Sequence, residues 1–366
     1  MSAEATRLAE VEQTAARFAA RHLAPAAADV DHADPAFPAA VFALGLEAGF
    51  DRFMLPESAG GYGFTLAELG ALVAVLARTC AGHAAVFGVH AAIVAAMHEA
   101  GGPAAELLTR VFSSGWPLAV AIPEPLSPHD FETEVAIDAR RSATGRAGLA
   151  INAAPHGFAV AFAKDENKTP LAFLAPADQS GVVVGPAEFT LGLRAMPLAE
   201  LSFADWPLPA EQVIGAGDAA LAFYRTLLRY LAYTVSAAAL GTMQAARRQA
   251  LAYMAQRYQG GRMIIDHSHL RQILGAMTAA EIAAAGALAQ AAARPDWFTA
   301  LGVKAFATDA AARLAADAVQ LLGGYGYMRE YGLEKRLRDA ATLALLPISN
   351  PRAELLLAAM EKETLS

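Results

Sequence analysis

The strongest constraint on the fold of this chain is a hydrophobic period that changes twice along it. Up to about residue 115, apolar residues recur at the spacing of one helix face, as in residues 66–79 and 83–100. Between residues 117 and about 215 the pattern changes to short apolar runs of strand length, bounded by turn residues. Helical spacing then returns in long segments. This order predicts a mainly α protein with an inserted β domain, not an alternating α/β sheet.

The two changes of period divide the chain into three predicted domains. We expect an N-terminal helical domain at residues 1–116, a middle β domain at 117–216 and a C-terminal helical bundle at 217–366. Thr65 and Glu68 have the spacing of a capping box, which predicts that a helix begins at residue 66. The middle domain is expected to be antiparallel and built from short strands. The strands are expected at residues 117–122, 158–163, 171–174, 182–184 and 198–203, and the later helices at 221–258 (one helix or two), 267–293, 297–322 and 352–362.

The charge pattern excludes several classes of partner. The net charge is −8 and no run of five basic residues occurs, so we expect no nucleic-acid binding. The longest apolar run, near residues 279–293, contains Glu281 and Gln290 and is shorter than the roughly 20 residues of a membrane span. We therefore expect no membrane insertion. Only 17% of the residues are charged, which favours helix faces that are buried between subunits.

The N-terminus and the single cysteine indicate the compartment. Residues 1–10 contain charged side chains and no apolar segment of the kind found in signal peptides, so a cytoplasmic location is expected. Cys80 has no partner for an internal disulfide, which fits a reducing compartment. Its apolar neighbours in the sequence predict a structural thiol.

Five segments carry a family resemblance. In the same order and spacing, they resemble motifs of the acyl-CoA dehydrogenase family. The segments are residues 55–63 (Leu-Pro-Glu-Ser-Ala-Gly-Gly-Tyr-Gly), 120–125 (Val-Ala-Ile-Pro-Glu-Pro), 208–215 (Leu-Pro-Ala-Glu-Gln-Val-Ile-Gly), 320–327 (Gln-Leu-Leu-Gly-Gly-Tyr-Gly-Tyr) and 338–340 (Arg-Asp-Ala). The resemblance implies an N-terminal helical domain, a middle β-barrel domain and a C-terminal four-helix bundle. It also implies FAD and an acyl-CoA thioester bound between the domains.

The position of the catalytic base is the main departure from the family. Flavin-dependent desaturation of a thioester needs a carboxylate that removes the α-proton. The resemblance places that carboxylate at Pro347, or, as in some relatives, at Leu231. Neither side chain can accept a proton, and no acid occurs in residues 230–240 or 343–352. The sequence therefore predicts no catalytic residue.

The segments that contact the flavin ring in the family are also altered. Residues 126–130 read Leu-Ser-Pro-His-Asp where the family has Gly-x-Gly-Ser-Asp, and residues 150–153 read Ala-Ile-Asn-Ala where it has Trp-Ile-Thr-Asn. His129 and Asp130 are the ionisable side chains of the altered loop. Loop ends favour Asp in any case, so a chemical role for them is the weaker interpretation.

The dinucleotide end of the FAD site is better preserved. The resemblance assigns contacts with the pyrophosphate and adenosine, in an FAD shared across a subunit interface, to Arg257, Gln320, Gly323 and Gly324. An arginine offers a fork of donors to phosphate, and glycine permits close backbone approach. Taken alone, the two glycines could be only a helix C-cap and Arg257 only a solvated cation at a helix end.

Three functional hypotheses follow. The first is the base-less subunit of a hetero-oligomeric acyl-CoA dehydrogenase. Its partner would carry the catalytic Glu, its substrate would be a bulky acyl-CoA such as a steroid side-chain thioester, and an electron-transfer flavoprotein could accept the electrons. The second is a homo-oligomeric FAD enzyme with a non-standard base or a different flavin reaction. The third is a scaffold without FAD. No metal site is expected, because His267 and His269, at i and i+2, do not share a helix face.

Overall fold

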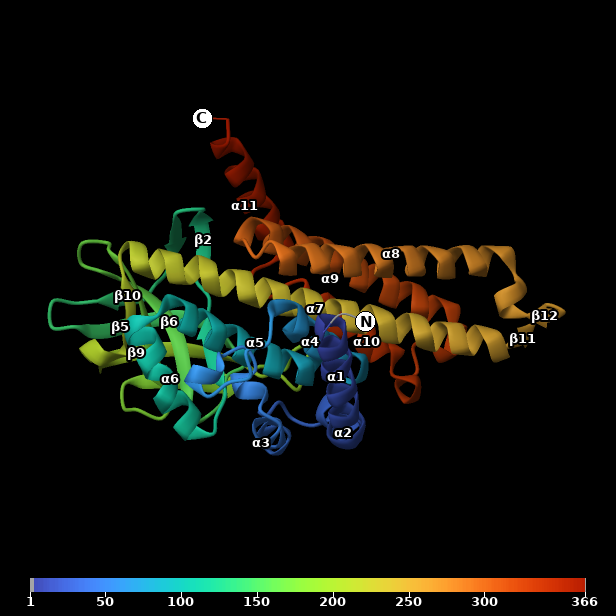
Figure 1. Ribbon diagram of the computed structural model, residues 1–366, viewed down its shortest axis with the longest axis horizontal. Coiled ribbons are helices and arrows are strands. Elements are labelled where there is room, and N and C mark those ends of the chain that lie inside the picture. The colour runs from blue at the N-terminus through green and yellow to red at the C-terminus, as the bar shows by residue number, and fades with distance from the viewer. Residues whose placement is uncertain (1–2, 366) are drawn as a thin grey trace.

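The computed structural model describes residues 3–365, and its three regions follow one another along the chain (Figure 1). The first region is helical and packs beside the middle of the long helix α7. Its elements are α1 (Ala3–Phe18), a π turn (Ala19–Leu23), α2 (Ala24–His32), α3 (Ala39–Glu47), two 3-10 turns (Phe50–Arg52 and Glu57–Ala59), α4 (Leu66–Thr79), α5 (Ala81–Ala100) and α6 (Gly102–Ser114).

Helix α4 begins at the predicted capping box, which is confirmed. The Thr65 hydroxyl accepts a hydrogen bond from the Glu68 backbone N–H, and the Glu68 carboxylate accepts one from the Thr65 N–H at 2.6 Å. The same carboxylate accepts a hydrogen bond from Arg7 Nη2 at 2.7 Å, which ties α1 to the start of α4.

The middle region is an eight-stranded sheet. The hydrogen-bonded order is β10-β7-β6-β1-β5-β9-β8, with β4 beside β5 and β6. The strands are β1 (Leu118–Ala121), β4 (Ala136–Ile137), β5 (Ser142–Ile151), β6 (Phe158–Asp165), β7 (Pro170–Pro176), β8 (Val182–Ala187), β9 (Leu198–Pro207) and β10 (Val213–Ala216). A separate hairpin is formed by β2 (Glu124–Ser127) and β3 (Asp130–Glu132). Among the described strands, β10 and β8 stand at the two ends of this order and do not pair with each other. We therefore describe a sheet and not a barrel.

The expectation of a purely antiparallel domain was wrong. Strand β1 pairs parallel with β6, and β4 also pairs parallel with β6. Strand β5, ten residues long, was not expected at all. Its pairing with β9 shifts register twice, near Gly145 and Gly148, which both have positive φ. Each shift interrupts the alternation of apolar and polar side chains, so the strand has no clear period in the sequence.

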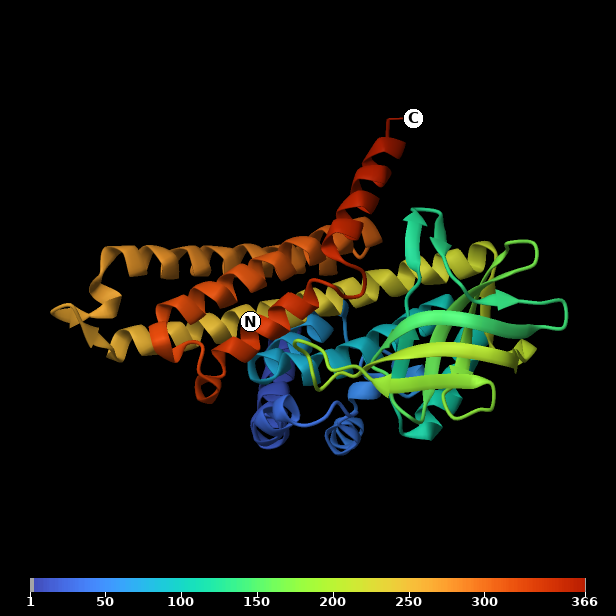
Figure 2. The same ribbon diagram turned by 180° about the vertical axis from the view of Figure 1, so that it is seen from behind.

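The third region is built on α7 (Asp218–Gln256), a single helix of 39 residues. Helix α7 packs against α4 and α5 on one side and against α8 (Ser268–Ala293) and α9 (Trp297–Leu321) on another (Figure 2). A short hairpin of β11 (Tyr258–Gln259) and β12 (Arg262–Met263) separates α7 from α8, and α10 (Leu333–Leu343) and α11 (Asn350–Glu363) follow α9. Helix α10 was not anticipated.

Two helices in the described part of the chain are long and apolar enough to cross a membrane. In α5, 94% of the most apolar stretch is buried inside the fold, as expected of a core helix. In α8 the corresponding share is 17%, and Ile282 is 68% exposed. A large apolar surface of α8 is therefore uncovered in the single chain.

Candidate functional site

The two positions assigned to a catalytic base lie together in the fold. Leu231 lies in the middle of α7, and Pro347 lies in the buried segment between α10 and α11. Both line a single cavity of about 10 Å³. The other lining residues come from α5, α7, the end of β5, the loop before β9 and the segment between α10 and α11: Ala85, Val89, Ile151, Met196, Thr234, Val235, Ala238 and Leu346.

This cavity contains no group that could remove a proton from carbon. None of its lining residues among those described carries a carboxyl group, and the only polar side chain is that of Thr234. The Thr234 hydroxyl donates to the backbone carbonyl of Leu231 at 3.1 Å, so it is already engaged within α7. The volume suits about one water molecule, whereas ligand sites usually measure hundreds of cubic ångströms.

Asn152 follows β5 at the point where the family resemblance places a contact with the flavin ring. It is fully buried, with a left-handed φ of 65°. Its amide donates to the carbonyls of Val86 in α5, at 3.3 Å, and Leu118 in β1, at 3.0 Å. The side-chain oxygen has no hydrogen-bond partner among the described residues. The Asn152 side chain therefore joins α5 to the sheet within the protein core.

The altered loop after β2 forms contacts at the protein surface. His129 Nε2 lies 3.1 Å from Glu363 Oε2 at the end of α11, and Asp130 pairs with Lys164 at 2.9 Å. The Tyr224 hydroxyl donates to the Pro123 carbonyl at 2.9 Å, which holds the start of the hairpin against α7. His129 and Asp130 are thus engaged outside the cavity that contains Leu231 and Pro347.

Lys304 on α9 is a residue that the sequence interpretation missed. It is fully buried, and its ammonium group donates to the carbonyls of Ala344 at 2.9 Å and Ile348 at 2.6 Å and to Asn350 Oδ1 at 2.7 Å. These acceptors flank Pro347, so Lys304 fixes the segment that closes the cavity. Burial lowers the pKa of Lys304 to about 7, while its three acceptors match the three N–H groups of the charged form. The sequence did contain a signal for this residue, because Lys304 stands among apolar positions of a long predicted helix.

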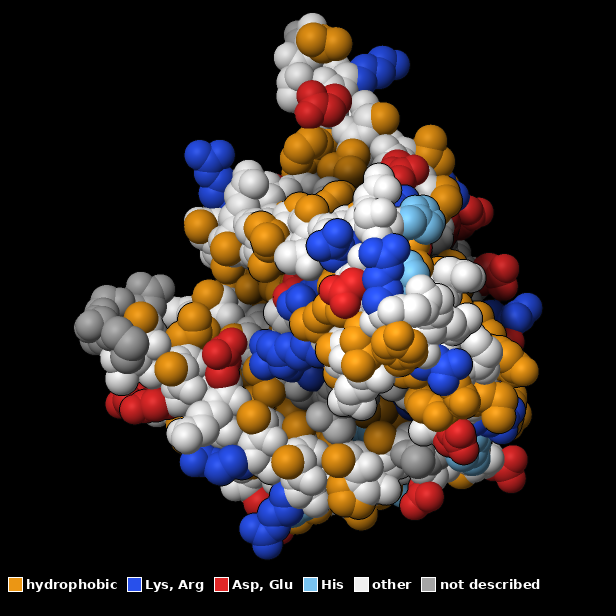
Figure 3. Space-filling view, turned by 90° about the vertical axis from the view of Figure 1, so that its right-hand side faces the viewer, with side chains coloured by type: hydrophobic (Ala, Val, Ile, Leu, Met, Phe, Trp, Pro, Cys, Tyr) orange, Lys and Arg blue, Asp and Glu red, His pale blue; other side chains and the backbone are white. Residues whose placement is uncertain are grey.

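The four residues assigned to the dinucleotide end lie at the opposite end of the bundle from the sheet. Arg257 follows α7, Gln320 is in the last turn of α9, and Gly323 and Gly324 follow it. All four are exposed, and the Arg257 guanidinium lies 6.0 Å from the ring centre of Tyr325. Figure 3 views this end of the molecule and shows basic side chains beside hydrophobic ones on it.

The glycines of this turn differ in what surrounds them. A Cβ atom built on Gly323 or Gly324 would meet no atom within 4 Å, so both face open space. Gly323 also has a φ of +58°, which favours glycine. A Cβ on Gly326 would instead lie 2.1 Å from the carbonyl oxygen of Val319, so that glycine is required by packing. An exposed arginine beside an open glycine turn can accept a phosphate group.

Comparison with known proteins identifies the class. The profile described as "Acyl-CoA dehydrogenase, N-terminal domain" matches residues 6–106, and "Acyl-CoA dehydrogenase, C-terminal domain" matches residues 222–346. The chain is 30% identical over 347 residues to a benzylmalonyl-CoA dehydrogenase of Aromatoleum aromaticum, covering 90% of this chain and 91% of that protein. It is 27% identical over 353 residues to an acryloyl-CoA reductase (NADH) of Anaerotignum propionicum, covering 90% and 88%.

Solved structures support the same class at the level of the fold. The butyryl-CoA dehydrogenase of Megasphaera elsdenii superposes with a TM-score of 0.88 at 24% identity, covering 97% of this chain and 98% of that one. The fold that the two share is mostly helical with a central sheet domain. This chain belongs to the acyl-CoA dehydrogenase family.

The family implies FAD, and the two ends of that cofactor fit this chain differently. The flavin ring and an acyl thioester do not fit the 10 Å³ cavity at Leu231 and Pro347, and the cavity offers no free polar group to either. The exposed Arg257 and the open turn at Gly323 and Gly324 do fit a pyrophosphate. The dinucleotide end would therefore be held by these residues, and no chemical step is assigned to the cavity.

Proposed function

We propose that this chain is the base-less subunit of a hetero-oligomeric acyl-CoA dehydrogenase. In this proposal a second, related subunit carries the catalytic Glu, the flavin-ring contacts and the acyl-CoA site. This chain contributes the dinucleotide end of a shared FAD through Arg257, Gln320, Gly323 and Gly324. The observation that carries the proposal is the closed apolar cavity in which Leu231 and Pro347 replace both known base positions.

The distance between the two candidate ends supports a shared cofactor. Leu231 lies in α7, and Arg257 is the first residue after this helix. At the helical rise of 1.5 Å per residue, the two residues are about 39 Å apart. One dinucleotide does not span that distance. The residues around Arg257 would therefore serve an FAD whose ring lies in another subunit.

The uncovered face of α8 supports assembly with another chain. The helix is apolar but mostly exposed in the single chain, and Gly275 and Gly286 leave open space where a Cβ would lie. Small residues on an exposed apolar helix permit close approach by a second helix, and burial of such a face stabilises a complex. The first residues of α8 lie at the same end of the molecule as the end of α7, which Arg257 follows (Figure 1).

The test is the flavin content of the protein alone and in complex. The chain should be purified by itself, then co-expressed with an acyl-CoA dehydrogenase-like protein that retains the catalytic Glu. We expect a colourless chain alone and about one FAD per heterodimer with the partner. One FAD bound per unaided chain would contradict the proposal and would favour a homo-oligomeric flavoenzyme with a non-standard base.

A matched pair of variants tests the assigned end of the cofactor. Arg257→Met should lower FAD retention by the complex at least about tenfold, since it removes a charge-assisted contact with phosphate. Arg313→Met, at an exposed position on α9 with only a 3.7 Å contact to Asp309, is the control and should retain FAD. If the two variants retain FAD equally well, Arg257 does not contribute to the FAD site.

A further inference from the structure

A second cavity, of about 240 Å³, lies where the N-terminal helices meet α10. Its wall is formed by α2, by the junction of α4 and α5, by α7 and by residues 329–339. Three basic side chains line it: Lys335 and Arg336 on α10, and Arg329 shortly before that helix. The volume is below that of most sites for drug-sized ligands, so it suits an ion or a very small molecule.

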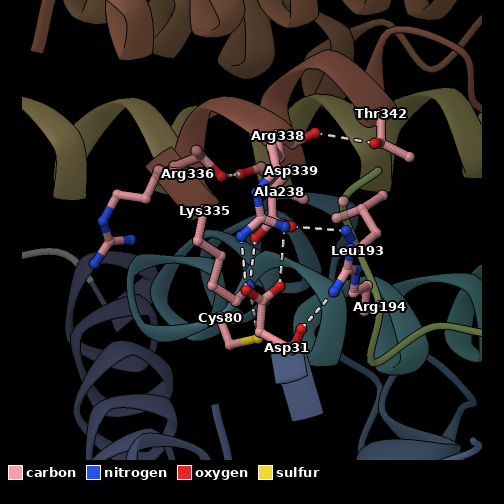
Figure 4. A network of polar contacts seen from close by, with 12 residues as sticks. Asp31, Cys80, Leu193, Arg194, Ala238, Lys335, Arg336, Arg338, Asp339 and Thr342 are labelled. Atoms are coloured by element: carbon pink, nitrogen blue, oxygen red, sulfur yellow. Dashed lines mark hydrogen bonds and ion pairs between the residues drawn. The ribbon is translucent and has the colours of Figure 1, made fainter. Parts of the chain in front are cut away.

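Most of the acidic side chains on this wall are already neutralised by other cations. Asp31 Oδ2 accepts from Arg338 at 2.6 Å, and Asp339 Oδ2 accepts from Lys335 at 2.6 Å. The Glu334 carboxylate accepts from Arg338 at 2.7 Å. Figure 4 shows the pairs of Asp31 and Asp339 as parts of one network. These carboxylates therefore leave the remaining cations of the cavity uncompensated, apart from the exposed Glu330.

Arg336 is a cation of this wall that has no counter-ion. Its guanidinium forms one hydrogen bond with the described residues, from Nη1 to the backbone carbonyl of Arg78 at 3.0 Å. Its Nε is buried and has no hydrogen-bond partner among them. Figure 4 shows the side chain extending away from the network of Asp31 and Asp339. Burial lowers the pKa of Arg336, and a charge removed from water is costly unless an opposite charge lies beside it.

The hydrogen-bond donors of Arg336 have the geometry that recognises an oxyanion. The N–H groups of Nε and Nη2 form one edge of the guanidinium, and such an edge binds two oxygens of a carboxylate or a phosphate. A second guanidinium, that of Arg329, is exposed on the same wall. Its Nη1 lies 3.3 Å from His32 Nδ1, and it forms no ion pair in the described part of the chain. Both groups favour an anion in this cavity.

The start of α5 adds positive potential from a different element. Ala81, the first residue of this 20-residue helix, lines the cavity. The helix begins after Cys80, which makes no side-chain capping hydrogen bond and whose Sγ lies 3.6 Å from Lys335 Nζ. The N-terminus of a helix carries a partial positive charge and free N–H groups, both of which favour an anion.

We propose that this cavity binds one small oxyanion, a phosphate or a carboxylate group, at Arg336 and Arg329. The anion supplies the counter-charge that Arg336 lacks. Because the cavity wall comes from α2, α4, α5, α7 and α10, the bound anion joins the N-terminal helices to α10. Binding forms and breaks no covalent bond. The proposal does not depend on whether this chain binds FAD.

The experiment is calorimetric titration of the full chain with sodium phosphate and, separately, with sodium acetate, at neutral pH and at equal ionic strength. We expect one site per chain for at least one of the two anions, and the tighter of the two identifies the chemical class. Absence of binding by both anions at millimolar concentrations would overturn the proposal.

Four variants locate the bound anion. Arg336→Gln should weaken its binding at least about tenfold, and Arg336→Lys should recover only part of the affinity, because it keeps the charge but loses the fork. Arg313→Gln, with a side chain that is 70% exposed on α9, is the control and should bind as the wild type does. Arg257→Met should also bind normally, which distinguishes this cavity from the proposed FAD site.

The opposite pattern would overturn the proposal. If Arg257→Met loses the anion and Arg336→Gln keeps it, the anion occupies the proposed FAD site and not this cavity. That result would leave the proposed function intact, so the two proposals fail independently.

Hydrogen exchange of the wild-type chain gives a second measurement that needs no variant. At an anion concentration ten times its Kd, openings that release the anion should become about tenfold rarer. The amides of residues 81–84 and 333–337 should therefore exchange more slowly when the anion is bound. Unchanged exchange in both segments at a saturating anion concentration would overturn the proposal, even if Arg336→Gln fails to fold.

Discussion

Leu231 on α7 and Pro347 between α10 and α11 line the same closed cavity, although α8, α9 and α10 separate them in the chain. The fold thus brings both alternative base positions of the family to one point and fills that point with apolar side chains. A carboxylate introduced at either position would meet a nearly dry environment.

Leu231→Glu tests how dry that cavity is. An ionised carboxylate without a partner is costly to bury, so the variant should lose at least about 3 kcal/mol of unfolding free energy at neutral pH. The loss should be smaller at acidic pH, where the buried carboxyl is neutral. Urea unfolding at both pH values, with Leu231→Gln as the neutral control, checks this. An equal loss for Glu and Gln at every pH would mean that the cavity is solvated.

Gly324→Ala and Gly326→Ala form a matched pair in the turn after α9. A Cβ on Gly324 meets open space, so the unfolding free energy of Gly324→Ala, measured by thermal unfolding, should differ from that of the wild type by no more than about 0.5 kcal/mol. A Cβ on Gly326 would lie 2.1 Å from the Val319 carbonyl oxygen, so that variant should lose about 1–3 kcal/mol. In the complex, Gly324→Ala should weaken FAD retention without unfolding the chain. If both variants are equally stable, the turn is not packed as described.

Lys304→Met tests the three hydrogen bonds that hold the segment containing Pro347. The substitution leaves the Ile348 carbonyl without its buried donor. It also removes one of two donors from the Ala344 carbonyl, which keeps the Asn350 N–H, and from Asn350 Oδ1, which keeps the Thr308 hydroxyl. We expect a loss of roughly 3 kcal/mol in unfolding free energy. Lys362→Met, on the exposed side of α11, should have almost no effect in the same urea titration. If the two variants have similar unfolding free energies, the hydrogen bonds of Lys304 do not stabilise the protein.

His90 should make the protein sensitive to acid. Its Nδ1 accepts a hydrogen bond from the Leu118 N–H at 3.0 Å, and burial lowers the pKa of the ring to about 3. Because the unfolded chain binds this proton near pH 6.5, the unfolded state holds more protons between about pH 6.5 and 3. Stability should therefore fall as pH decreases through that range, by up to about 1.4 kcal/mol per pH unit from this residue.

A comparison of two histidine variants checks the assignment of the acid sensitivity. His90→Gln should flatten the dependence of unfolding free energy on pH between about 6.5 and 3, whatever its effect at neutral pH. His269→Gln, at an exposed position on α8, should leave that dependence as in the wild type. A steep dependence that persists in His90→Gln would assign the sensitivity to another group.

Local sequence patterns predicted much of the fold and failed where long-range pairing decided it. The capping box at Thr65 was predicted because it depends on residues close in sequence. Strand β5 and the parallel pairings of β6 were not, because Gly145 and Gly148 interrupt the period and because a parallel partner is distant in the chain. Helix α10 was also missed.

The sequence by itself determined that Pro347 and Leu231, the two positions to which the family resemblance assigns a base, carry no proton acceptor. It also determined the family, through motifs that are local and ordered. Only the tertiary structure decided that these two positions share one closed cavity, that Lys304 fixes the segment above it, and that Lys335 lies beside Cys80. Cavity volume and the pKa of a side chain depend on groups that distant elements bring together, and no local pattern in the sequence encodes them.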